Sequence, residues 1–305
     1  MQESVTVRAE PPSIMEQVQK FIAGLTPREK PETLYHYTSA RGLVGILATC
    51  SIWSTSIRFL NDSREYELAL EIAEDVLSEC ISDAKNSFLE GVYRALQEGL
   101  RRVEGTEVYV TSFSAIGDQL SQWRGYCPVG KGYSIGVAPE ALIRRTKPKH
   151  ERFLAPCVYV QEQQEKRIQD VVAHVTTFAE RCHTLEPDNR DRVFRESFKL
   201  FTHLLPLVAP VIKDHSFSEE KEWRVVSITD AFTERIPKVR VGRSMLIPYF
   251  EHRLAKTASS LPLKDLVVGP TPHPQLAIQS AQSLLERHGQ GRIHIRNSKV
   301  PYRGW

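Results

Sequence analysis

The first residues that could carry chemistry form a short polar segment, YHYTS at residues 35–39. Along a strand, alternate side chains point to opposite faces, so His36 shares a face with Leu34 and Thr38, and Tyr35 shares the other with Tyr37. An imidazole flanked by hydroxyl groups can donate a hydrogen bond to a sugar hydroxyl or a phosphate. The alternative is a half-buried histidine at the end of a strand, followed by a helix cap.

A second polar segment, TSFS at residues 111–114, alternates hydroxyl groups along a predicted strand. It leads into a polar connection, GDQLSQWRGY at residues 117–126, which holds Trp123 and Tyr126. Either ring can stack on a flat ligand ring such as nicotinamide or adenine. The alternative interpretation is an aromatic hinge that packs this connection onto the core.

The third segment is EEKEWR at residues 219–224. Strand alternation places Glu222 and Arg224 on one face, whereas Trp223 points the other way with Val225. A carboxylate on a strand is rigidly positioned, which suits a contact to a sugar 2′-hydroxyl and the stabilisation of positive charge at an anomeric carbon. The alternative is a cross-strand ion pair on a solvated face.

Regular elements must position these three segments. Apolar spacing predicts helices over residues 13–25, 40–50, about 69–80, about 89–103, within 161–213 and over 274–288. Strand-like runs occupy residues 33–39, 51–56, 107–114, 132–139, 155–160, 221–228, 263–270 and 292–296. Thr38 or Ser39 can cap the second helix, and Asp62 the third. Strands and helices alternate without a regular βαβ rhythm, so we expect an α+β fold with a helical insertion at about 161–213.

Composition limits the class of protein. The 305 residues contain 40 Lys and Arg against 37 Asp and Glu, a formal charge of +3. This balance argues against a DNA-coating or polybasic membrane protein, and the ordinary apolar content argues against disorder, collagen and coiled coil. The five scattered cysteines form no C-x-x-C pair, and no signal peptide or membrane-length apolar run is present. We therefore expect a cytoplasmic protein with reduced thiols and no membrane partner.

Several well-known catalytic fingerprints are missing from the sequence. It has no G-x-x-x-x-G-K-[ST] and no G-x-G-x-x-G phosphate loop, no H-E-x-x-H and no G-x-S-x-G elbow. The histidines do not pair with carboxylates at metal-binding spacing, so we expect no metal. What remains is the order of the three polar segments: a histidine early, serines with an aromatic residue in the middle, and a glutamate late.

In this order the sequence resembles a family. The segments LYHYTSARGLVGILATCSIWSTSIRFLNDSREY, VYVTSFSAIGDQLSQWRGY, GKGYSIGV, EEKEWRVV, LKDLVVGP and KVPYR follow those of the bacterial DUF2971 family, over about residues 33 to 303. The resemblance implies an N-terminal helix and linker at 1–30 and a single DUF2971-like domain at 31–305. The pattern is also similar to the ADP-ribosyltransferase-like superfamily, which implies a split mixed or antiparallel sheet of that type.

In that superfamily a His-Tyr-Glu or Arg-Ser-Glu triad lies on strands that line a crevice for NAD. By resemblance, His36 binds the adenine-side ribose, Trp123 or Tyr126 stacks on nicotinamide, and Glu222 holds the nicotinamide-side ribose. No tyrosine takes an unambiguous middle position, so the two aromatic residues compete. NAD is the expected co-substrate. Further nucleotide-binding residues are expected at Tyr35, Thr38, Ser39, Arg58, Ser112, Ser114, Arg124 and Arg224. Asn61 and Asp62 belong to the FLND segment of the family. Asp62 is expected to cap a helix, and a role in substrate binding is the alternative.

Three functional hypotheses follow. The first is an NAD-consuming transferase or glycohydrolase, such as a toxin or phage-defence effector that acts on protein, tRNA or DNA. It requires His36 and Glu222 to face one cleft. The second is a non-catalytic module that binds a nucleotide or a nucleic-acid end, suggested by the basic residues Arg287, Arg292, Arg296, Lys299 and Arg303. The third is a nuclease that uses His36 or His215.

Overall fold

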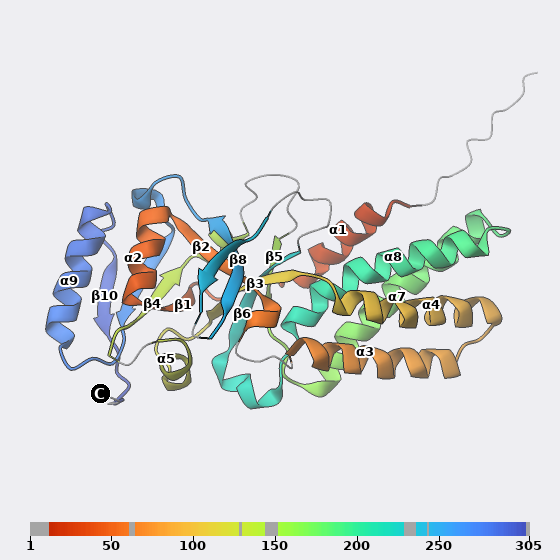
Figure 1. Cartoon of the computed structure of the whole chain (residues 1–305), viewed down its shortest axis with the longest axis horizontal. Coiled ribbons are helices and arrows are strands. Elements are labelled where there is room, and N and C mark those ends of the chain that lie inside the picture. The colour runs from red at the N-terminus through yellow and green to blue at the C-terminus, as the bar shows by residue number, and fades with distance from the viewer. Residues whose placement is uncertain are drawn as a thin grey trace, which may run out of the picture. The chain divides into compact units, whose positions relative to one another are not determined.

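In the computed structural model, which describes residues 12–60, 65–127, 130–143, 152–228, 236–242 and 244–302, ten strands form one mixed sheet (Figure 1). The main path is β10 (His294–Asn297), β9 (Leu263–Val268), β4 (Gly132–Val137), β1 (Leu34–Ser39), β3 (Val108–Ser114), β2 (Ser51–Ser56), β8 (Leu246–Arg253) and β7 (Lys238–Val241). β6 (Glu222–Ile228) joins β3 to β5 (Arg152–Pro156). Among the described pairs only β9–β10 is parallel. The expected α+β class is confirmed.

The sheet divides at β3. One edge of β3 pairs with β6 over its whole length. The other edge is shared: β1 pairs with its last residue, Ser114, and β2 pairs near its beginning. Side chains bridge the interval between these two contacts. The ring nitrogen Nδ1 of His36 lies 3.0 Å from the carbonyl oxygen of Ser112, and the hydroxyl groups of Ser54 and Thr111 lie 2.6 Å apart.

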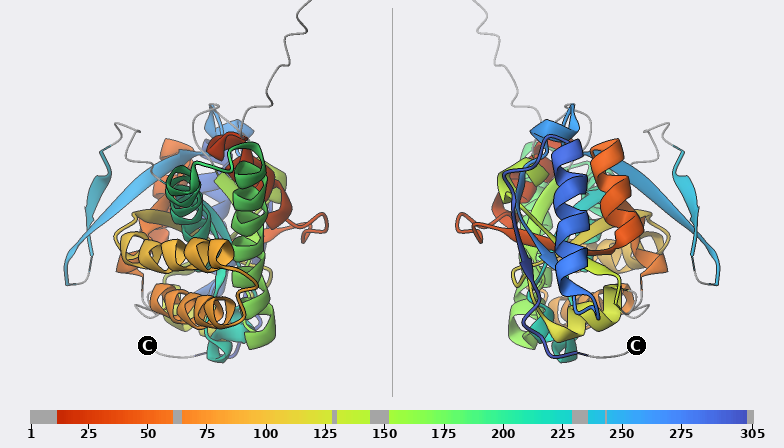
Figure 2. Two further views of the ribbon diagram at one scale, coloured as in Figure 1. Left: turned by 90° about the vertical axis from the view of Figure 1, so that its right-hand side faces the viewer. Right: turned by 90° about the vertical axis from the view of Figure 1, so that its left-hand side faces the viewer.

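Two helices, α2 (Ala40–Thr49) and α9 (Pro274–Arg287), cover one face of the sheet. Figure 2 (right) shows them side by side, in orange and blue. The hydroxyl of Ser39 caps α2, since it accepts a hydrogen bond from the N–H of Gly42 at 3.1 Å. The helices and strands share one buried apolar cluster. Its members include Leu34, Leu43, Leu47, Phe113, Ile135, Trp223, Leu266, Ala281 and Leu285.

The opposite face meets α5 (Leu120–Tyr126), which the sequence suggested only as a polar connection. Here a smaller buried cluster joins Tyr37, Trp123, Cys127 and Val267. The short elements of the same unit are α6 (Pro139–Leu142), η1 (Ile57–Phe59), η3 (His215–Glu220) and η4 (Ala258–Ser260). β7 and β8 were not expected from the sequence, and the strand expected at 155–160 lies at β5 instead.

The sheet and these helices form one of two compact units of the chain. The other unit is helical: α1 (Ile14–Leu25), α3 (Glu65–Ser82), α4 (Ser87–Glu104), α7 (Gln161–Leu185), α8 (Arg190–Val208) and η2 (Ala209–Val211). Figures 1 and 2 show α3, α4, α7 and α8 packed beside one another. The expected helical segment 161–213 therefore forms part of a larger helical unit.

Local sequence explains the packing within the helical unit. The side chain of Asn86 caps α4 by accepting the N–H of Leu89 at 2.9 Å. Gly99 lets α4 approach α8, because an added Cβ would lie 3.1 Å from the ring of Phe201. Asn61 and Asp62 lie outside the described residues. No helix in the described part of the chain combines the length and apolar content of a membrane crossing.

Candidate functional site

Strand register decides which of the predicted site residues meet. Tyr35 on β1 is the cross-strand partner of Ser114 on β3, which is in turn the partner of Glu222 on β6. Cross-strand partners share a face, so these three side chains form a line on the α5 side of the sheet. Asp265 on β9 extends the line, and its Oδ2 accepts the hydroxyl of Tyr35 at 3.3 Å. We call Asp265, Tyr35, Ser114 and Glu222 the polar row.

A glycine allows the row to cross β4. Gly136 lies between Tyr35 and Asp265 in the register. A Cβ at this position would lie only 1.9 Å from Oδ1 of Asp265. A larger residue would therefore displace the carboxylate from Tyr35.

His36 lies on the other face. Its cross-strand partner is Ile135, and its ring centroid is 5.7 Å from that of Phe113. Both of these residues belong to the cluster under α2 and α9. The alternation expected within each strand is confirmed, but Tyr35, rather than His36, has the register that leads to Glu222. The structure therefore places His36 and Glu222 on opposite faces of the sheet, so His36 does not take the position beside Glu222 that the resemblance implied.

His36 has a local role at the division of the sheet. Burial lowers its pKa below the ordinary value of 6.5, although the hydrogen bond to the carbonyl of Ser112 acts in the opposite direction. A neutral ring that donates from Nδ1 fits this contact. The interpretation of a half-buried histidine at a strand end agrees with this geometry.

A pH dependence follows from His36. Because its folded pKa is lowered, the neutral ring contributes stability above pH 6.5 that is lost as the pH falls towards the folded value. We expect His36→Gln, which can still donate to Ser112, to remove up to about 1.4 kcal/mol per pH unit of this slope. Urea unfolding between pH 7 and pH 5 measures it. The exposed His294→Gln is the control, and equal slopes in wild type and His36→Gln would contradict the assignment.

Three charged side chains, those of Arg224, Lys213 and Glu220, lie around Glu222 at the end of the row. Arg224 donates to both carboxylate oxygens of Glu222, from Nε at 2.7 Å and from its terminal nitrogen at 3.0 Å. The ammonium of Lys213 donates to Glu222 and to Glu220, at 2.6 Å each. Exposed fractions are 1% for Arg224, 2% for Lys213, 3% for Glu222 and 9% for Glu220. We call these four residues the acid–base cluster.

The two carboxylates of the cluster behave differently. Burial raises the pKa of Glu222, but the neighbouring Arg224 and Lys213 outweigh it and lower the pKa to about 2. For Glu220, burial outweighs the attraction of Lys213 and the pKa is raised. Glu222 therefore stays ionised across the physiological range. The structure differs from the cross-strand, solvated ion pair considered from the sequence, because Glu222 and Arg224 pair within β6 and both are buried.

The two competing aromatic residues have different surroundings. Trp123 is 2% exposed, its ring centroid lies 4.7 Å from that of Tyr37, and its indole N–H donates to Asp118 at 2.8 Å. It is a core residue and cannot stack on a ligand in this arrangement. Tyr126 is 38% exposed. Burial of its hydroxyl and the nearby carboxylates Glu222 and Glu220 raise its pKa. Of these two residues, Tyr126 is thus the one near Glu222.

The remaining predicted residues are divided between several places. Ser112 is the cross-strand partner of Arg224 on the face of the polar row. The hydroxyl of Ser114 donates to the carbonyl of Glu220 at 2.7 Å and accepts the N–H of Ile116 at 3.0 Å.

The other four predicted residues lie elsewhere. Thr38 and Ser39 contact the start of α2, Arg58 lies 3.9 Å from Glu107, and Arg124 stacks over Tyr302. These last four do not join the polar row.

Lys213 was not singled out from the sequence. It ends the apolar run from Leu204 to Ile212. A lysine that directly follows so apolar a segment is a candidate for burial, and a buried lysine needs a carboxylate partner. That signal could have identified Lys213, and the nearest predicted strand with carboxylates is the one that carries Glu222.

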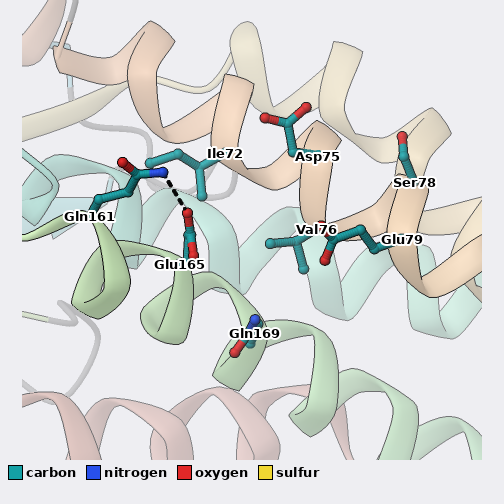
Figure 3. Close-up of a pocket in the computed structure, with 8 residues that line it drawn as sticks. All are labelled: Ile72, Asp75, Val76, Ser78, Glu79, Gln161, Glu165 and Gln169. Carbon is teal, nitrogen blue, oxygen red and sulfur yellow. Dashed lines mark hydrogen bonds between the residues drawn. The ribbon is translucent and has the colours of Figure 1, made fainter.

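The helical unit holds a groove of about 390 Å³ between α3 and α7 (Figure 3). Carboxylates and amides line it together with two apolar side chains. The lining residues are Ile72, Asp75, Val76, Ser78, Glu79, Gln161, Glu165 and Gln169. None of the site residues expected from the sequence is among them. Within the described residues, no three His, Cys, Asp or Glu side chains converge as a metal site would require.

Comparison with known proteins gives one match. Residues 122–225, about a third of the chain, match a family model described as "Protein of unknown function (DUF2971)". The match runs from α5 into β6, and so includes Trp123, Tyr126, Lys213, Glu222 and Arg224. The resemblance to DUF2971 is thereby confirmed over this segment. No curated protein and no solved structure matches the chain.

Proposed function

We propose that this chain, whose residues 122–225 match the DUF2971 family, consumes NAD in the manner of the ADP-ribosyltransferase-like superfamily, at the polar row and Tyr126. One observation carries the proposal. Ser114, on the strand where the sheet divides, and Glu222, on β6, are direct cross-strand partners, and Tyr126 lies near Glu222. Tyr35 takes the β1 position of the row that the resemblance assigned to His36.

The chemistry is cleavage of the bond between nicotinamide nitrogen and the ribose anomeric carbon. The electron pair of this bond leaves with nicotinamide, which becomes neutral, and positive charge develops on the ribose. Water or an acceptor nucleophile then forms the new bond to the anomeric carbon and loses a proton. An ionised carboxylate near the ribose stabilises the developing charge. With a pKa of about 2, Glu222 supplies that charge at neutral pH.

Access to Glu222 is part of the proposal. The side chain is 3% exposed, whereas Tyr126 beside it is 38% exposed. A ligand reaches the carboxylate when Tyr126 moves aside, and the phenol ring can then stack on the nicotinamide. Such a movement would also exclude water from the reacting bond once the ring closes again.

The test is nicotinamide release from NAD, measured by chromatography. We expect Glu222→Gln to lower the rate by roughly 10²–10³-fold, because the charge next to the ribose is lost. Glu220→Gln is the matched control, since it removes the other carboxylate of Lys213, and we expect less than about a tenfold effect. Thermal unfolding of each variant verifies the fold. Intact NAD after long incubation with folded wild-type protein, in the presence of a cell extract as a source of acceptors, would contradict the proposal.

A second candidate is a non-catalytic nucleotide-binding module. It is favoured by the contacts of Glu222 and Ser114: both carboxylate oxygens meet cations, and the serine hydroxyl already has backbone partners on both sides. A purely structural ion pair would have this geometry. Calorimetry with NAD separates the two candidates, because a binding module retains the nucleotide without releasing nicotinamide.

A further inference from the structure

We propose that Asp118 is a positioning residue that latches α5, and with it Tyr126, to the segment Ser298–Tyr302, here called the strap. The carboxylate of Asp118 accepts three hydrogen bonds. Its Oδ1 accepts the indole N–H of Trp123 at 2.8 Å and the hydroxyl of Ser298 at 2.5 Å. Its Oδ2 accepts the backbone N–H of Lys299 at 2.7 Å. One side chain thus joins the helix to a segment about 180 residues away in the sequence.

The strap is itself fixed to the sheet. The N–H of Ser298 donates to the carbonyl of Val268 on β9 at 2.7 Å, continuing the ladder of β10. Val300 packs against the cluster of Tyr37 and Trp123. Farther along, the guanidinium of Arg124 on α5 lies 5.2 Å from the ring centre of Tyr302. The strap therefore connects the sheet edge with α5 at two points.

α5 needs such attachments. It has seven residues, and isolated helices shorter than about 12–15 residues are marginal in water. Its N-terminal side is held by Asp118, by Trp123 in the core, and by Gln119, whose backbone N–H donates to the hydroxyl of Tyr37 at 3.1 Å. Its last residues are exposed, and no atom outside the helix lies within 4 Å of a Cβ built on Gly125.

Because the contacts of α5 are concentrated at its N-terminal side, the attachment there determines the position of Tyr126. Trp123 sits one turn before Tyr126, so whatever fixes the indole also fixes the direction in which the phenol points. Asp118 holds the indole N–H and the strap with the same carboxylate. Loss of this carboxylate would remove its hydrogen bonds to the strap and to the tryptophan together. That Tyr126 shields a ligand site rests on the proposed function, whereas the latch itself does not.

Hydrogen exchange of the full chain, followed by mass spectrometry, tests the latch. In Asp118→Ala we expect the amides of residues 120–126 to exchange roughly 10- to 100-fold faster, with α2 unchanged. Asp118→Asn keeps one acceptor oxygen and should restore part of the protection. The exposed Asp188→Ala is the matched control. Cleavage by trypsin after the exposed Arg124 should be fastest in Asp118→Ala, intermediate in Asp118→Asn and unchanged in Asp188→Ala.

Ser298→Ala guards against global unfolding of Asp118→Ala, because it removes only one of the two strap hydrogen bonds and leaves those that Trp123 and Lys299 donate to Asp118. It should give a smaller, local increase in exchange over residues 120–126. Unchanged exchange there in both folded variants would overturn the inference. If instead exchange responds as expected and wild type releases no nicotinamide, the proposed function fails and the latch stands.

Discussion

Replacement of Lys213 by methionine is expected to lower the free energy of unfolding by about 3–5 kcal/mol. Lys213 is 2% exposed and its ammonium is shared by Glu220 and Glu222 at 2.6 Å each. Methionine keeps the apolar stem but leaves two buried carboxylates with a single guanidinium, that of Arg224. Removing one partner of a buried ion pair costs much more than the pair contributes, because the remaining charge has no solvent to compensate it. Urea denaturation measures the loss.

Two further variants separate charge from packing at Lys213. Lys199→Met removes an exposed lysine that contacts Glu196 at 2.8 Å, and it should change stability by less than about 0.5 kcal/mol. Adding Glu220→Gln to Lys213→Met should recover part of the loss, since one uncompensated carboxylate disappears. A stability of Lys213→Met within about 1 kcal/mol of wild type would show that the acid–base cluster is not a buried charge network.

The second large effect is expected from Trp123→Ala, at about 3–5 kcal/mol of unfolding free energy. The indole is 2% exposed and packs on Tyr37. Two glycines make room for it, because a Cβ on Gly132 or Gly269 would lie 3.3 Å or 2.9 Å from its ring. Alanine would leave a cavity where several elements meet. Thermal and urea unfolding both report the change.

Tyr126→Ala is the contrasting variant on the same helix. Since Tyr126 is 38% exposed, its removal should cost less than about 1 kcal/mol, while nucleotide binding weakens. If Trp123 were instead the ring that stacks on a ligand, Trp123→Ala would weaken binding with little loss of stability. Trp123→Phe keeps one aromatic ring but loses the hydrogen bond to Asp118 and part of the buried ring system, so its loss of stability should fall between the two.

Local patterns predicted most of the elements and the faces within each strand. The alternation of side chains along β1 and β6 follows from the sequence of each strand alone. Ser39 caps α2, as its position before the predicted helix suggested. What local pattern could not supply is the register between strands. A shift of one residue exchanges the two faces of a strand. The pairing of Tyr35 with Ser114 therefore decides that His36 lies away from Glu222, and nothing in the separate segments encodes that pairing.

The missed elements have physical reasons. β8 contains Pro248, which weakens a strand prediction because proline cannot donate to the ladder. α5 is short and carries Gly125 near its end, so its helical period is hard to recognise. The role of Asp118 depends on residues about 180 positions later, and no local signal reaches that far. The residue types of the candidate site are thus predictable from the sequence, whereas only the fold determines which of these residues lie next to one another.

The division of the sheet at β3 also bears on how the chain folds. β3 is a junction whose three partners come from distant parts of the sequence: Tyr35 lies roughly 80 positions before Ser114, and Glu222 roughly 110 after it. The helices α3 and α4 fill the first interval, and α7 and α8 fill much of the second. Helices form from local contacts, and they shorten the loops that must close before these strands can pair. We expect the junction at β3 to assemble late, after those helices, and to set the rate of folding.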